Sequence, residues 1–90
     1  MTRDEAATLL DQLATDIAHA TMDWKIGNEV DVNVLINHAR YMAVQLRAKG
    51  PVLSVIESSW SLIIRFKTDP VVESWLRLHG RPMVRLFQAL

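Results

Sequence analysis

The sequence predicts an all-α fold, a compact four-helix bundle followed by a short fifth helix at the C-terminal end. Three observations support this fold class. Apolar residues recur at steps of three and four along most of the chain. Capping and helix-ending residues separate these apolar series, with Gly27, Gly50 and Asp69 as examples. The chain has 90 residues, of which 50% are apolar, enough for one hydrophobic core, so we expect a single domain over residues 1–90.

The first helix is predicted to start near Thr2. Thr2 and Glu5 have the spacing of a capping box, in which each residue bonds to the backbone of the other. The apolar residues that follow are spaced for one buried face of a helix of about 20 residues. They are Ala6, Leu9, Leu10, Leu13, Ile17, Ala20 and Trp24. Gly27 and Asn28 are the predicted stop, and the opposite face is polar and acidic.

A second helix is predicted over the residues before Gly50. Three valines near its start alternate with polar residues, a pattern that also fits a strand. The apolar series then continues at helical spacing for about four turns, which favours a helix. The series is Val32, Leu35, Ile36, Ala39, Met42, Ala43 and Leu46. We expect Asp31 or Asn33 as the N-cap, and Arg47 and Lys49 as a basic last turn.

The segment from about Val52 to Lys67 is nearly free of charge and is predicted to be a third helix. Part of it alternates as a strand would, but its polar residues recur at spacings of three, four and four. On a helix this spacing places them in one narrow polar seam. They are Ser54, Glu57, Ser61 and Arg65. The rest of the circumference is apolar, so we expect this helix at the centre of the bundle, covered by the others.

A fourth helix is predicted to begin at Pro70, because proline is favoured at the first helical position. Thr68 or Asp69 is the expected N-cap. Glu73 and Arg77 are spaced to form an ion pair on the outer face. The inner face is predicted to contain Val71, Val72, Trp75, Leu76 and His79.

Gly80 and Pro82 are predicted to end the fourth helix, because glycine is a poor helix former and proline lacks the N–H that a helix interior needs. His79 then falls in the last turn, where the helix dipole favours a cation. Residues 82–90 are predicted to form the short fifth helix. Its inward residues are Met83, Leu86, Phe87 and Leu90.

No residue pattern indicates a catalytic or metal site. The chain contains no cysteine, which excludes disulfides, thiolate chemistry and the commonest ligand of structural zinc. Asp16, His19 and Asp23 share one face of the first helix and could bind a divalent ion, but no second ligand-bearing helix is evident, and we predict a solvated acidic face. His38 is expected at the surface, and Ser59 is expected to be a small residue that lets a neighbouring helix approach. We therefore expect no enzymatic activity and no cofactor.

Charge and hydropathy limit the partners that the sequence predicts. The net charge is zero, but residues 1–45 contain three Lys/Arg and seven Asp/Glu, whereas residues 46–90 contain seven and three.

The longest apolar tract, residues 52–64, is shorter than the roughly 20 residues that span a bilayer, so no membrane contact is expected. Asp4 and Glu5 stand where a secretory signal would be basic, and we expect a cytoplasmic protein.

The chain has more large apolar residues than one small core normally buries, 35 of Leu, Ile, Val, Met, Phe and Trp. Its C-terminal third combines aromatic and guanidinium groups, a composition typical of binding hot spots. The predicted interface residues are Trp75, Arg77, Arg81, Arg85 and Phe87. We therefore predict an adaptor, inhibitor or assembly factor that acts through protein–protein interaction and forms a homodimer. The dimer is expected to bury apolar surface of the third and fourth helices, with the acidic first helix facing the basic C-terminal segment.

A nucleic-acid-associated regulator is the alternative function. The second half of the chain is basic and contains Arg65, Lys67, Arg77, Arg81 and Arg85, which could contact phosphates. The zero net charge weighs against nucleic-acid binding, and the third helix is too apolar to read base edges.

Overall fold

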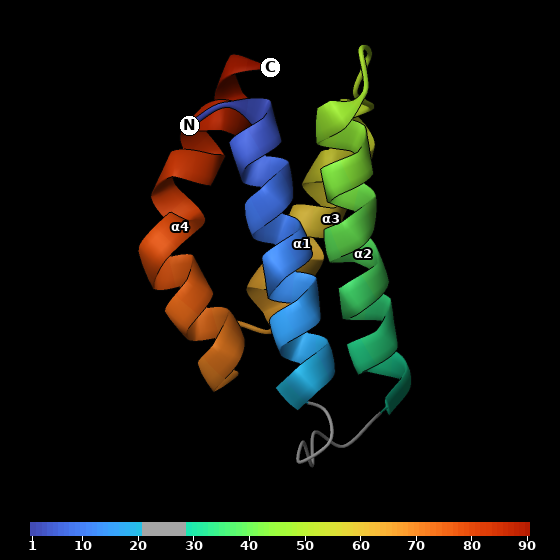
Figure 1. Cartoon of the computed structure of the whole chain (residues 1–90), viewed down its shortest axis with the longest axis vertical. Helices are drawn as coiled ribbons and strands as arrows, with labels where there is room; N and C mark the ends of the chain where they lie inside the picture. Colours follow the sequence, from blue (N-terminus) through green and yellow to red (C-terminus); the bar gives the residue numbers. More distant parts are fainter. Residues whose placement is uncertain (21–28) are drawn as a thin grey trace.

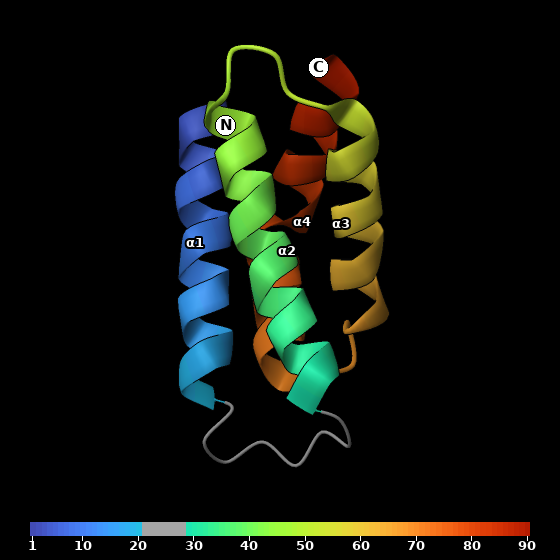
Figure 2. The ribbon, with the colours of Figure 1, turned by 90° about the vertical axis from the view of Figure 1, so that its right-hand side faces the viewer.

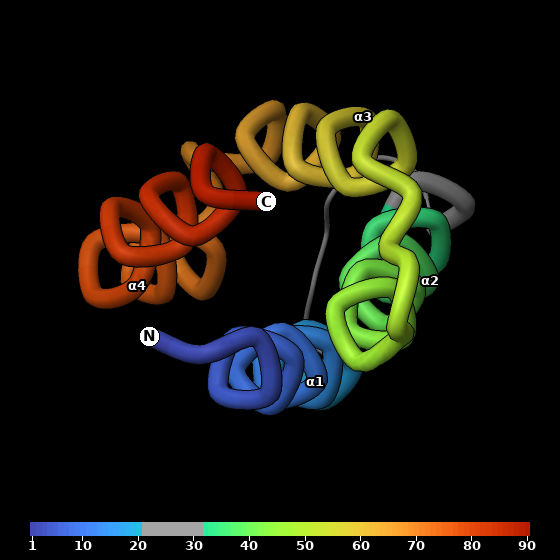
Figure 3. The backbone as a smooth tube through the Cα atoms, turned by 90° about the horizontal axis from the view of Figure 1, so that it is seen from above, coloured from blue at the N-terminus to red at the C-terminus, as the bar shows by residue number. Residues whose placement is uncertain are grey.

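The computed structural model describes residues 1–20 and 29–90, which form four helices. The helices are α1 (Arg3–Ala20), α2 (Glu29–Arg47), α3 (Leu53–Arg65) and α4 (Pro70–Ala89). Consecutive helices run in opposite directions (Figures 1 and 2) and, seen from the end, occupy the corners of a ring in chain order (Figure 3). The all-α prediction is confirmed, and no strand occurs among the described residues.

Helix α1 begins with the predicted capping box. The Glu5 backbone N–H donates to the Thr2 hydroxyl at 3.1 Å, and the Thr2 N–H donates to Glu5 Oε1 at 3.3 Å. Two of the N–H groups that lack a helical partner are thereby satisfied. The hydrogen bonds from the Thr2 side chain and then the Thr2 backbone hold the pKa of the Glu5 carboxyl below its ordinary value of 4.5.

The pKa of Glu5 is lower in the folded state than in the unfolded chain, so ionised Glu5 stabilises the fold at pH values above 4.5. This stabilisation is lost as the pH falls through the lowered pKa. We expect an NMR titration of the Glu5 carboxyl carbon to give a pKa below 4.5, and the Thr2→Ala variant to titrate higher than the wild type. The wild-type chain, titrated under the same conditions, serves as the control. An unchanged Glu5 titration in Thr2→Ala would contradict the capping assignment.

Helices α1 and α2 pack against each other more extensively than any other pair. Both contain fully buried alanines, and small side chains at a helix contact let the two backbones approach closely. These alanines are Ala6, Ala7 and Ala14 in α1 and Ala39 and Ala43 in α2. Large residues such as Leu10, Ile17 and Leu46 are also fully buried and complete the core. The whole series predicted for α2 is buried, and in α1 the predicted residues Ala6, Leu10, Leu13 and Ile17 are buried, Leu9 and Ala20 are partly buried, and Trp24 lies outside the described residues.

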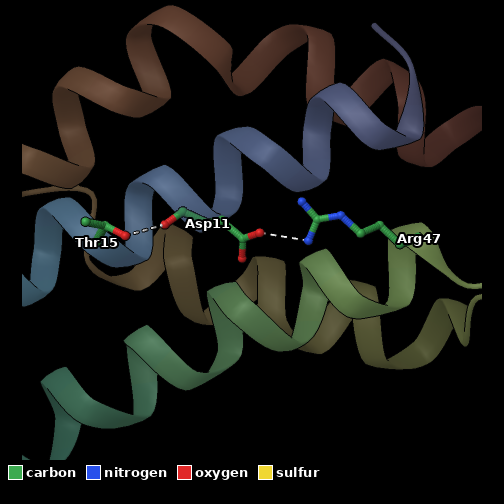
Figure 4. Close-up of polar contacts among 3 residues, drawn as sticks. All are labelled: Asp11, Thr15 and Arg47. Carbon is green, nitrogen blue, oxygen red and sulfur yellow. Dashed lines mark hydrogen bonds and ion pairs between the residues drawn. The ribbon is translucent and has the colours of Figure 1, made fainter.

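Polar contacts link α1 to the C-terminal end of α2, and one of them is an ion pair between the acidic and basic halves of the chain. Arg47 Nη1 lies 2.7 Å from Asp11 Oδ2, and the Thr15 hydroxyl donates to the Asp11 carbonyl at 3.1 Å (Figure 4). Arg3 donates to the Ala48 carbonyl at 3.0 Å. An ion pair as exposed as Asp11–Arg47 contributes only about 0.2–1 kcal/mol, so packing remains the main source of stability.

The start of α2 differs from the prediction. The helix begins at Glu29, so neither Asp31 nor Asn33 is the N-cap. Apolar periodicity identifies the buried face of a helix, but it does not determine where the first turn begins. The predicted stop of the first helix at Gly27 and Asn28 lies outside the described residues.

Helix α3 has the predicted polar seam but not the predicted position. All four seam residues are exposed. However, α3 occupies a corner of the ring (Figure 3), and only Ile56, Ser59 and Ile63 are buried. Leu53 and Ile64 are 45% and 37% exposed. In a ring of four helices each helix has two neighbours, so none is covered on all sides. Apolar surface of α3 consequently remains uncovered.

Helix α4 begins as predicted, since the Asp69 carboxylate accepts from the N–H groups of Val71 and Val72 at 2.9 and 3.3 Å and Pro70 occupies the first turn. The predicted fifth helix is wrong, because α4 continues through Gly80 and Pro82 to Ala89. His79 is therefore in the middle of the helix rather than in its last turn.

Burial explains why α4 does not stop. Trp75 and Met83 are buried eight residues apart, close to the spacing of one helical face, so a break between them would turn Met83 and the residues after it away from the core. Pro82 is exposed, and it leaves the Leu78 carbonyl without its helical N–H partner. The helix is bowed outward at its middle (Figure 1), as expected for a proline inside a helix.

Candidate functional site

An aromatic cluster joins α4 to α3 and α1. The Trp60 ring lies 6.1 Å from that of Trp75 and 5.2 Å from that of Phe87, centroid to centroid, in tilted and edge-to-face geometry. The His79 ring stands against Trp75 at 5.6 Å. The Trp75 indole N–H also donates to the Leu9 carbonyl of α1 at 3.1 Å. Aromatic pairs of this geometry add about 0.5–1.5 kcal/mol each beyond their buried area, so the cluster holds α4 in place.

The structure divides the predicted interface residues into two groups. Trp75 is only 7% exposed and belongs to the core, and Phe87 is half-buried against Trp60. Arg77, Arg81 and Arg85 are exposed on α4. The aromatic and guanidinium groups therefore do not form one mixed surface, and the Trp75 side chain is not available to a partner. The interface role of the arginines stays a prediction.

A groove runs between α3 and α4. Their backbones come close at fewer points than those of the other neighbouring helices, and long side chains such as Trp60 bridge the distance. One hollow of about 410 Å³ is lined by residues that include Trp60, Ile64, Arg81 and Val84. A second, of about 210 Å³, is lined by residues that include Leu53, Glu57, Trp60 and Val84. Trp60 and Val84 line both hollows, so the two hollows adjoin, and together they are called the α3/α4 groove.

The α3/α4 groove has an acidic and a basic end. Of these two hollows, Glu57 lines only the one beside Leu53, whereas Arg81 and Arg85 line only the one beside Ile64. None of the three charged groups forms an ion pair within residues 1–20 and 29–90. Their charges are therefore available to a bound partner.

Arg77 lies outside this groove. It forms the predicted ion pair with Glu73 one turn earlier on α4, which confirms that pairing. Together with Arg81 and Arg85 it lines an open hollow of about 930 Å³ between Met1 and the outer face of α4. The three guanidinium groups follow at intervals of four residues, so they lie along one side of the helix.

A partly buried hydrogen bond that the sequence did not indicate joins α2 to α3. His38 Nδ1 lies 2.9 Å from the hydroxyl of Ser59, which is fully buried. The sequence predicts a plain surface histidine, and the structure shows that His38 is half-buried and bonded to Ser59. Ser59 is small, as predicted for close helix approach, but it is closed to substrate, and a nucleophile must be reachable. The two residues are 21 positions apart on different helices, so no local spacing relates them.

Two of the three candidate metal ligands of the sequence lie on the outside of α1. Asp16 and His19 are exposed, and Asp23 lies outside the described residues. In the part of the chain that the structure describes, no three His, Asp or Glu side chains are grouped so that they could hold one metal ion. No helix of that part combines the length and the hydropathy that a membrane crossing requires.

Comparison of the chain with protein-family models, with curated proteins and with solved structures finds no match. A functional assignment therefore depends on the residues and their geometry.

Proposed function

We propose that the protein acts in the cytoplasm through protein–protein interaction, as an adaptor, inhibitor or assembly factor without enzymatic activity, and that the α3/α4 groove contacts its partner. The observation that carries this proposal is the uncovered apolar surface of the groove. Leu53, Ile64 and Val84 are 45%, 37% and 37% exposed along it, and the Trp60 ring joins its two halves. Water-exposed apolar surface collected in one concave site is typical of a binding site.

The composition of the groove supports binding of a protein. Tryptophan and arginine are enriched among residues that dominate interface energies, and both occur here beside apolar neighbours. The aromatic cluster holds Trp60 in a fixed orientation before a partner binds, which reduces the entropy lost on binding. Tyr41 on α2 is also exposed and lines a hollow of about 240 Å³, but the other residues that line this hollow, Asn37 and His38, are polar.

Two matched valines allow a direct test. Val84 in the groove and Val34 on α2 are 37% and 38% exposed, so lysine at either position can reach solvent without disturbing the core. We expect Val84→Lys, but not Val34→Lys, to lower the recovery of bound proteins at least about 10-fold when tagged chains are captured from their native cells and compared quantitatively. Circular dichroism should show equal helix content for both variants. If Val84→Lys retains every protein that the wild type binds, the groove is not the contact surface.

A nucleic-acid-associated regulator is the second candidate function, favoured by the row of Arg77, Arg81 and Arg85 on one side of α4. Titration with duplex and single-stranded DNA at two salt concentrations distinguishes the candidates. Phosphate contacts release counterions, so true binding must weaken steeply as salt rises. The pairing of Arg77 with Glu73 reduces the charge that this row can offer.

A further inference from the structure

We infer that the occupant of the α3/α4 groove is a second copy of the same chain, bound antiparallel about a twofold axis that passes close to Trp60 and Val84. The inference rests on the proposed function, because it identifies the partner of the same groove. It is carried by the order of charged and apolar residues along the groove. When a second groove is laid over the first in the opposite direction, this order places unlike charges opposite each other.

The charged residues are placed symmetrically about the centre of the groove. Trp60 and Val84 line both hollows and therefore mark this centre. Glu57 precedes Trp60 by three residues on α3, and Arg81 precedes Val84 by three residues on α4. Each charge thus lies about 4.5 Å along its helix from the centre. Because α3 and α4 run in opposite directions (Figure 2), the two displacements are opposite.

A twofold axis at this centre brings unlike charges together. Rotation by half a turn places the acidic end of one groove over the basic end of the other, so Glu57 of each copy faces Arg81 of its partner. An isologous interface repeats every contact, and the pairing therefore occurs twice. Neither residue has an ion-pair partner among the described residues of its own chain, so no existing ion pair is broken when the dimer forms.

The apolar residues follow the same order. Ile64 lies four residues after Trp60, and Leu53 lies seven residues before it. The same rotation therefore lays Ile64 of one copy over the hollow of the other that Leu53 and Gln88 line. Ile64 and Leu53 are both exposed in the single chain, and placing Ile64 in this hollow removes apolar surface from water.

Other surfaces of the chain fit the groove less well. The exposed residues of α1 are polar, so α1 cannot supply the apolar groups that would fill it. They are Asp4, Glu5, Thr8, Gln12, Thr15, Asp16 and His19. The acid–base contact expected between copies is therefore made by Glu57 rather than by α1. Arg85 lies near the axis but also lines the outer hollow of α4, and its long side chain can turn toward that hollow.

Charge reversal tests both the pairing and its symmetry. In sedimentation equilibrium of the purified full chain we expect Glu57→Arg and Arg81→Glu each to raise the dimer dissociation constant about 10- to 100-fold, because each reverses two contacts. An equimolar mixture of the two variants should recover wild-type association, because each heterodimer contact again joins unlike charges. The double variant Glu57→Arg/Arg81→Glu should recover it as well. Arg77→Glu, the same charge change on α4 outside the groove, is the control and should leave association within about 3-fold.

The possible outcomes separate this inference from the proposed function. A wild-type chain that stays monomeric at micromolar concentration overturns the inference, whereas the proposed function stands if Val84→Lys still loses proteins captured from cells. Rescue in the double variant without rescue in the mixture shows that Glu57 and Arg81 pair within one chain, and this also overturns the inference. A dimer that Glu57→Arg and Arg81→Glu do not weaken uses another surface and overturns it too.

Discussion

Trp75→Ala is expected to destabilise the protein by about 3–5 kcal/mol, the range for removal of a buried aromatic side chain. This is a large share of the roughly 5–15 kcal/mol that keeps a domain folded. The indole is 7% exposed, contacts Trp60 and His79, and donates a hydrogen bond to Leu9. Its loss leaves a cavity where α1, α3 and α4 meet, and the structure around it can relax only partly.

Two further variants show which part of Trp75 matters. Trp75→Phe keeps a ring but lacks the N–H, so we expect a smaller loss, about 1–2 kcal/mol. Leu78→Ala is the control on the same helix, because Leu78 is 71% exposed, and it should change stability by no more than about 0.5 kcal/mol. Urea unfolding followed by circular dichroism measures all three. If Trp75→Ala costs no more than Leu78→Ala, Trp75 is not part of the core.

Pro82→Ala is expected to stabilise the protein by about 1–3 kcal/mol. A proline inside a helix costs roughly 3 kcal/mol relative to alanine, because it removes one backbone hydrogen bond and its ring crowds the preceding turn. Pro82 is exposed in the middle of α4, so alanine restores the bond to the Leu78 carbonyl without loss of core packing. The greater freedom that alanine gives the unfolded chain reduces the gain.

Pro70→Ala is the matched control for this prediction. Pro70 is also exposed but occupies the first turn of α4, where the missing N–H has no helical partner and proline is favoured. We expect it to be neutral or slightly destabilising, within about 1 kcal/mol. Thermal unfolding of both variants gives the comparison. If Pro82→Ala behaves like Pro70→Ala, Pro82 begins a separate helix, as the sequence pattern predicts, and α4 is not continuous.

The sequence by itself determined the features that depend on residues within one helix. The capping box of Thr2 and Glu5, the Asp69 cap and the Glu73–Arg77 pair all connect residues two to four positions apart, and all three are present. The buried series of α1 and α2 and the exposed polar seam of α3 follow from the same helical period. The excess of apolar residues over one small core is likewise a property of composition.

Only the tertiary structure decided the features that join distant residues. Helix α4 continues through Pro82 because the free energy gained by burying Met83 and the residues after it is larger than the cost of a proline inside the helix. The cost of the proline is evident from the sequence, but the burial is not. The corner position of α3 and the His38–Ser59 bond depend on which helices are neighbours. Helical spacing determines which residues share a face of one helix, whereas the choice of neighbours depends on many weak burial energies summed over the whole bundle.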